Sequence, residues 1–145
     1  MSKSPILPSQ AMGYAFQRAY LARKYKGPAT ANQLWTKKQL SESTYEPGTQ
    51  ITDHFEVVDK TPTEITVRCG DSPRRPEPRN SDGLFVMSAK VDREQGVVEL
   101  GVKSCFFNSL TRQEGIAGPM PPWMENLHAW YSRLLLATAS WRLVR

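Results

Sequence analysis

The chain of 145 residues has few of the groups that hold small secreted proteins or metalloproteins together. It contains two cysteines and two histidines, which are too few for a disulfide framework, and no CxxC or HxxxH spacing suggests a metal site. No stretch approaches the roughly 18 to 20 consecutive apolar residues of a membrane-spanning helix, and the N-terminus lacks the apolar run of a secretory signal. These absences predict a cytoplasmic protein with reduced cysteines and no bound metal.

Motifs for cofactor chemistry are also missing. The sequence has no Gly-rich phosphate loop, no nucleophile elbow, no HExxH motif and no paired carboxylates. We therefore expect no cofactor. An enzyme built on this chain would depend on proton transfer and on holding its substrate in a reactive shape.

Acidic residues are missing from the first 40 residues, although this stretch carries seven of the 19 basic residues. The remaining 12 basic and 14 acidic residues give about −2, against +5 for the whole chain. A basic start of this kind is typical of a transit peptide, and it could also bind nucleic acid or an anionic membrane. Nucleic-acid binding is the minor hypothesis, because no stacking motif is interleaved with the charges. We expect residues 1–40 to be a basic helical segment of the fold.

The composition that is present predicts one globular domain over residues 1–145. Hydrophobic residues make up 39% and charged residues 23% of the chain, which is ordinary for a folded protein. Apolar residues at helical spacing follow Ser9 and stop before Gly27, where "KGPAT" breaks the pattern. A second short helix is expected at 30–40, with Thr30 as its N-cap.

From residue 51 to residue 107 the apolar pattern alternates with a period of two, which predicts antiparallel strands. "DHFEVVDK" and "TEITVRCG" read as a hairpin around "KTPT", and "LFVMSAKVD" and "GVVELGVKSCFF" are the longest strand candidates. The alternation places Cys69 and Cys105 on different faces, so a disulfide between them is not expected. The intervening "DSPRRPEPRNSDG" reads as a solvated loop.

The last predicted element is a helix over 122–144, which starts after Pro121. At about 100° per residue, its large apolar residues share one arc, which we expect the sheet to bury. Such a stripe is either plain core or one wall of a ligand pocket. The arc contains Trp123, Leu127, Trp130, Tyr131, Leu134, Thr138 and Trp141.

The order of these elements, and the stretches "PGTQITDHFEVVDKTPTEITVRCG", "SDGLFVMSAKVD", "GVVELGVKSCFFNS" and "HAWYSRLLLATASWRLVR", resemble the START-like (SRPBCC, helix-grip) superfamily, and within it a domain family of unknown function. The resemblance covers roughly residues 47–145. It implies an α+β fold in which a curved antiparallel sheet grips the long C-terminal helix around an apolar cavity. Relatives include lipid carriers, hormone receptors and aromatase/cyclases.

The chain departs from that superfamily in two respects. Typical members have six or seven strands and begin with a strand, whereas this sequence predicts four strands and a helical start. A second chain could supply the missing strands, and an unpaired sheet edge invites such pairing, so a homodimer is a candidate state.

Candidate site residues follow from the expected pocket. His128, at the edge of the apolar arc, is the candidate general acid/base, and Tyr131 is its hydrogen-bonding partner one turn later. Asp53 precedes Phe55 and Val57 by two and four residues, so it is expected on the same face of the sheet as these pocket-facing residues and could reach the pocket mouth. Against these roles, a boundary histidine is often structural, and an Asp beside a turn often only ends a strand. The candidate ligand-binding residues are Trp123, Leu127, Trp130, Phe55, Ser104 and Phe106.

The leading functional hypothesis is a cofactor-independent cyclase or isomerase, or a related lyase, of secondary metabolism. Its substrate would be a polyketide- or terpenoid-like apolar molecule. The alternative is a non-catalytic carrier that binds an apolar ligand in the same pocket.

Overall fold

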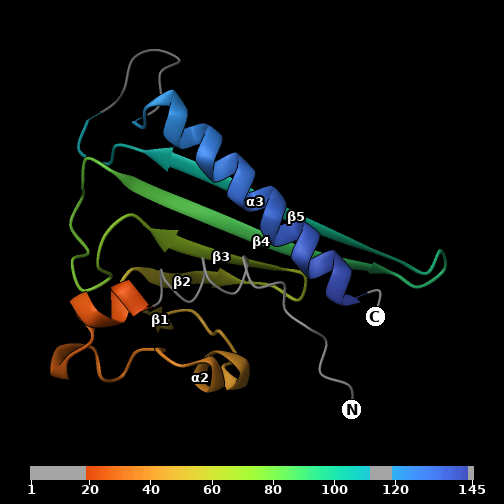
Figure 1. Cartoon of the computed structure of the whole chain (residues 1–145), viewed down its shortest axis with the longest axis horizontal. Helices are drawn as coiled ribbons and strands as arrows, with labels where there is room; N and C mark the ends of the chain where they lie inside the picture. The colour runs from red at the N-terminus through yellow and green to blue at the C-terminus, as the bar shows by residue number, and fades with distance from the viewer. Residues whose placement is uncertain (1–18, 112–118, 144–145) are drawn as a thin grey trace.

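The computed structural model describes residues 19–111 and 119–143. The fold is α+β, with a five-stranded antiparallel sheet in the order β1-β2-β3-β4-β5 and a long C-terminal helix that runs diagonally across it (Figure 1). The elements are η1 (Pro28–Thr30), α2 (Lys37–Glu42), β1 (Gln50–Ile51), β2 (Phe55–Lys60), β3 (Glu64–Cys69), β4 (Asp82–Asp92), β5 (Val97–Phe107) and α3 (Pro122–Leu143).

The N-terminal part differs from the prediction of a helix over 30–40. Residues 19–25 are helical and end before Gly27, as expected, but Ser9 and the residues up to 18 lie outside the described residues. Thr30 is not an N-cap. It is buried in η1, where its hydroxyl donates to the Tyr25 carbonyl at 3.0 Å and its carbonyl accepts from the Trp35 indole at 2.9 Å.

The second helix starts later than predicted, because the cap is Thr36. The Thr36 hydroxyl accepts from the Gln39 backbone N–H at 3.2 Å, and the Gln39 side chain accepts from the Thr36 N–H at 2.9 Å. This reciprocal capping box satisfies N–H groups that the first turn leaves without partners. The Trp35 indole bonds to Thr30 in η1, and Leu34 forms an isolated bridge with Ile51, so residues 31–36 are not helical.

The predicted hairpin is confirmed. β2 and β3 pair antiparallel with Val57 opposite Val67, and a bulge between Val57 and Asp59 shifts the register. β1 is a two-residue strand added to the outside of β2, which the sequence pattern does not predict. The buried apolar residues lie at this end of the sheet: Trp35, Val57, Val67 and Cys69.

The two longest predicted strands are confirmed as β4 and β5, which pair in register over 11 residues each. Phe85 lies opposite Val67 on one side and opposite Ser104 on the other. Side chains alternate between faces, so these residues share one face, which we call the helix side because α3 contacts it. The free cysteines Cys69 and Cys105 lie on opposite faces, as expected.

α3 begins at Pro122 as predicted, but the expectation that the sheet buries its apolar arc is wrong. No residue of α3 is buried, and Trp123 and Trp130 are 63% and 60% exposed, with Leu127 also exposed. The His128 ring contacts the sheet, and it lies about a third of a helical turn from that stripe. The sheet therefore touches the flank of the arc rather than its centre.

Candidate functional site

Three rings form the contact between α3 and the sheet. The His128 ring lies 4.9 Å from Phe106 and 6.3 Å from Phe85, measured between centroids, in tilted arrangements. Phe85 and Phe106 pack edge to face at 5.7 Å, a geometry that aromatic quadrupoles favour. β4, β5 and α3 thus place a titratable ring on an aromatic floor, in a half-buried position.

Gly83 makes this floor possible. It lies opposite Cys69 on β3 and Phe106 on β5. A Cβ at this position would come within 2.9 Å of both the Cys69 sulfur and the Phe106 ring, which is closer than real Cβ contacts. The Phe106 ring therefore occupies the space that a side chain at position 83 would need.

Beyond the three rings, part of the helix side of the sheet is exposed, although Val67 and Cys69 on β3 are buried there. Met87 lies on the interior strand β4, between Ile65 on β3 and Val102 on β5, yet it is 43% exposed. Tyr131 and Leu135, on the next turns of α3, are also exposed. The apolar surface between α3 and β4 is therefore incompletely covered.

The Trp stripe lies on the flank of α3. Trp123, Leu127 and Trp130 recur at spacings of four and three, so they line one side of the helix, and all are exposed. Of the other predicted ligand-binding residues, Phe106 is in the aromatic floor and Ser104 is exposed on the helix side opposite Phe85. Phe55 contacts the ring of His54 edge to face at 5.0 Å.

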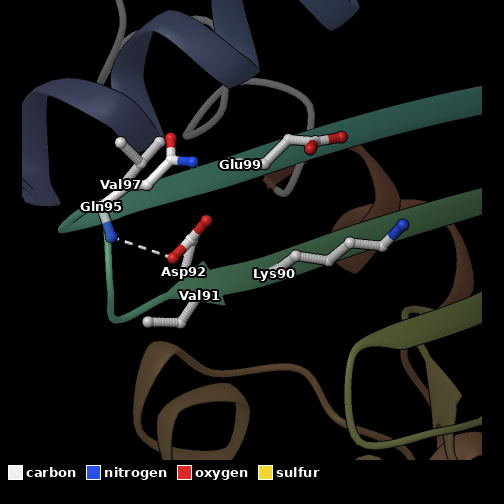
Figure 2. Close-up of a pocket in the computed structure, with 6 residues that line it drawn as sticks. All are labelled: Lys90, Val91, Asp92, Gln95, Val97 and Glu99. Atoms are coloured by element: carbon white, nitrogen blue, oxygen red, sulfur yellow. Dashed lines mark hydrogen bonds between the residues drawn. The ribbon is translucent and has the colours of Figure 1, made fainter.

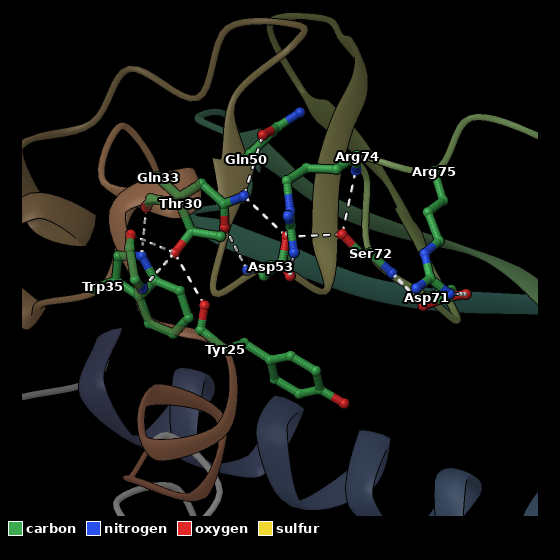
Figure 3. A network of polar contacts seen from close by, with 11 residues as sticks. Tyr25, Thr30, Gln33, Trp35, Gln50, Asp53, Asp71, Ser72, Arg74 and Arg75 are labelled. Atoms are coloured by element: carbon green, nitrogen blue, oxygen red, sulfur yellow. Dashed lines mark hydrogen bonds and ion pairs between the residues drawn. The ribbon is translucent and has the colours of Figure 1, made fainter.

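The structure does not bring Asp53 to His128 and Tyr131. Asp53 lies in the β1–β2 turn rather than in a strand, and it is buried. Its carboxylate accepts from Arg74 Nε at 2.8 Å and Arg74 Nη2 at 2.7 Å, and also from the Ser72 hydroxyl at 2.8 Å and from Gln33 Nε2 at 3.1 Å (Figure 3). These contacts join the N-terminal segment, the turn and the loop after β3.

The contacts of Asp53 also affect the charge of its carboxyl group and the backbone conformation of the turn at Thr52 and Asp53. The hydrogen bond from Arg74 lowers the pKa of Asp53 to about 2, against the opposing effect of burial, so the carboxylate is ionised at neutral pH. Thr52 and Asp53 both have a φ of 51°, a left-handed conformation that costs a β-branched residue such as Thr of order 1–3 kcal/mol. The Gln33 side chain accepts from the Asp53 N–H and helps to hold this turn.

A second buried carboxylate, Asp82, lies at the start of β4. It pairs with Arg68, with Nη2–Oδ2 at 2.6 Å and Nε–Oδ1 at 3.0 Å, and accepts from the Ser109 hydroxyl at 2.9 Å. Burial favours the neutral acid, but the hydrogen bonds from Arg68 and Ser109 leave the pKa of Asp82 lowered. Arg68 points to the face opposite α3, so this pair supports the sheet from the other side.

Two depressions in the described parts of the chain lie away from the contact between α3 and the sheet. One, of about 260 Å³, surrounds the β4–β5 turn. Figure 2 shows it lined by charged and aliphatic side chains, with the Gln95 N–H donating to Asp92 Oδ1 at 3.0 Å. The other, of about 360 Å³, lies beside β1 and is lined by Asn32, Leu34, Ser43, Gly48, Thr49 and Gln50.

Within residues 19–111 and 119–143, no group of three or more His, Cys, Asp or Glu side chains could hold a metal ion. No helix in those ranges is both long enough and apolar enough to cross a membrane.

Sequence reasoning missed four residues that define these sites. Phe85 and Met87 lie in a predicted strand, and the alternation around Phe85 could have assigned both to the helix side. Gln33 and Arg74 lie in segments without periodicity, and no sequence signal joins them to Asp53.

Comparisons with protein-family models, with curated proteins and with solved structures find no match to this chain. Any function assigned to the protein therefore rests on the geometry of its own residues.

Proposed function

We propose that the protein binds an apolar small molecule on the helix side of the sheet, beside α3. The observation that carries this proposal is Met87. A large apolar side chain at the centre of a sheet is normally covered by the element packed on that face. Here α3 passes over the sheet and leaves Met87 43% exposed.

The surroundings of Met87 suit an apolar ligand. The floor is aliphatic and aromatic, with Met87 and Val102 continuing from the aromatic pair Phe85 and Phe106. The wall is α3, which contributes the exposed Leu135. Methionine adapts its shape to different ligands. The half-buried His128 is a polar group that could orient a ligand at the edge of this floor.

The area of exposed apolar surface limits the affinity that is expected for a ligand. Covering roughly 200 Å² of apolar protein surface contributes on the order of 5 kcal/mol, before the loss of translational and rotational freedom on binding. Because about 4.1 kcal/mol corresponds to a Kd of 1 mM, we expect Kd values of a few hundred micromolar or weaker, and a preference for ligands large enough to reach α3 and the sheet together.

A titration with the uncharged, environment-sensitive dye Nile red tests the proposal. Met87→Lys places a charge on the floor and should weaken dye binding at least tenfold. Val58→Lys is the matched control, because Val58 is 41% exposed and lies in the bulge of β2, two strands away from β4. Equal loss of binding in both variants, or none in either, would contradict the assignment of the site.

A second candidate function is acid/base catalysis on the bound molecule, as a cofactor-independent cyclase or isomerase acting on a polyketide- or terpenoid-like substrate. The position of His128 favours it, because the ring sits on the aromatic floor with Tyr131 one turn further along α3. An imidazole can accept a proton from a substrate, and the imidazolium that forms can return it. Asp53 takes no part in this proposal, because its carboxylate is bound to Arg74.

The antiparallel sheet with a C-terminal helix across it is consistent with the proposed START-like relationship. Five strands, one of them two residues long, are fewer than that superfamily usually has. Recovery of a bound compound with altered mass after incubation would favour catalysis, and recovery of an unchanged compound would favour a carrier.

A further inference from the structure

The outer edge of the sheet at β5 is long. β5 is the last strand in the sheet order, and within residues 19–111 and 119–143 its 11 residues pair with β4 and with no other strand. In Figure 1 the strand runs along one border of the sheet and continues into the projecting β4–β5 hairpin. Among the described residues, no turn or loop backbone bonds to β5. An edge of this length is a template for another strand.

The side chains along this edge are complementary to a second copy of the same strand. Glu99 and Lys103 lie on the face opposite α3, two residues on either side of Gly101, and both are exposed. If two copies of β5 pair antiparallel about a twofold axis at Gly101, Glu99 of each copy lies directly opposite Lys103 of the other. Two cross-strand ion pairs form, and no like charges meet.

The same register matches the apolar positions. Leu100 of each copy lies opposite Val102 of the other on the helix side. Val97, which is 51% exposed, lies opposite Cys105, which is also exposed. Directly opposed side chains of this kind are the unit of stabilisation in antiparallel sheets. A self-complementary patch is what a twofold interface requires.

We propose that the β5 edge is a homodimer interface, in which two copies pair antiparallel about Gly101 and join their sheets into one. α3 of both copies then lies on the same face of the joined sheet. The ion pairs lie on the face opposite α3, away from the proposed ligand site, whereas Val102 on the helix side belongs to both surfaces.

A charge-swap series in the full-length chain tests the register. Lys103→Glu is the first variant, because Lys103 is opposite the uncharged Val86 within its own chain, whereas Glu99 is opposite Lys90. Sedimentation equilibrium should show a dimer for the wild type and at least a tenfold weaker dimer for Lys103→Glu. The double variant Lys103→Glu/Glu99→Lys should restore dimerisation to within a few-fold of the wild type. Circular dichroism checks that each variant is folded.

Crosslinking gives an independent measurement. Val97→Cys should form an intermolecular disulfide with Cys105 under mild oxidation by copper phenanthroline. The two positions are eight residues apart on one strand, about 27 Å, so they cannot bridge within one chain. Val97→Cys/Cys105→Ser should crosslink at least tenfold less. A wild type that stays monomeric at several hundred micromolar, or a dimer that is indifferent to both the charge swap and the cysteine pair, would overturn the proposal.

Discussion

The His128 imidazole of α3 lies 4.9 Å from the ring of Phe106, centroid to centroid, and contacts the aromatic floor. The packing role of His128 can be tested apart from its acid/base role, because a phenylalanine ring could fill the same space but could not transfer a proton. We predict that His128→Phe keeps ligand binding within about threefold of the wild type, whereas His128→Ala opens a gap and weakens it further. If the protein is an enzyme, His128→Phe should lose turnover while retaining binding. Native mass spectrometry measures both quantities, and full turnover by His128→Phe would exclude the acid/base role.

Replacing the carboxylate of Asp53 should destabilise the protein. Asp53→Asn removes the charge that Arg74 faces and disturbs the bonds to Ser72 and Gln33. Because Arg74 is partly exposed, we expect a loss of about 2 kcal/mol in the free energy of unfolding rather than the larger cost of a fully buried pair. Urea denaturation checks this, with the exposed Asp59→Asn as control. Equal stability of both variants would contradict the role of the network.

The same carboxylates predict acid sensitivity. The pKa of Asp53 is about 2 in the folded protein, against an ordinary value of 3.8, and that of Asp82 is also lowered. A group with a depressed folded pKa contributes stability above its unfolded pKa and loses it as the pH falls toward the folded value. Stability should therefore drop between about pH 4 and pH 2. The loss of unfolding free energy between these pH values should be smaller in Asp53→Asn than in the wild type. The same pH profile in both proteins would contradict the lowered pKa of Asp53.

A methyl group at position 83 should disturb the floor. The Cβ of Gly83→Ala would meet the Cys69 sulfur and the Phe106 ring at 2.9 Å, so we expect a loss of about 1–3 kcal/mol. Gly27→Ala is the control, because no atom lies within 4 Å of the place that its Cβ would take. Thermal denaturation should separate the two variants. Ligand affinity should fall only in Gly83→Ala, since Phe106 must move to make room.

The two cysteines should differ in reactivity. Burial raises the pKa of the Cys69 thiol to about 11, which leaves little thiolate at pH 8, whereas Cys105 is exposed. Titration of the native wild type with Ellman's reagent should release one equivalent quickly, and the unfolded protein should release two. Cys105→Ser should release almost none while folded. A fast reaction in that variant would show that Cys69 is accessible.

The sheet can be predicted from the sequence because its signal is local. Alternation around Phe55 and Val57, and again along β4 and β5, identifies four of the strands, the two hairpins that they form and the faces of their side chains, but it does not predict β1 or the pairing of β3 with β4. The alternation of side chains between the two faces is enough to predict that Cys69 and Cys105 lie on opposite faces of the sheet. The C-terminal helix is predictable for the same reason, with its start at Pro122.

What the sequence does not provide depends on contacts between distant segments. The apolar stripe of α3 predicts a buried face, but helical periodicity does not say which side of the stripe meets the sheet, and the structure places His128 there. Strand parity assigns Asp53 to the pocket, yet Arg74 and Gln33 draw it into a turn. Thr30 has the residue type of an N-cap, but its contacts with Tyr25 and Trp35 override that preference.

The most direct test of the central claim is native mass spectrometry of the wild type and of Met87→Lys after incubation with an extract of apolar small molecules. We predict that the wild type retains a small molecule and that Met87→Lys does not, while Val58→Lys behaves as the wild type. A wild type that retains nothing, or the same molecule retained equally by Met87→Lys, would contradict the proposal that the open face beside α3 is a ligand site.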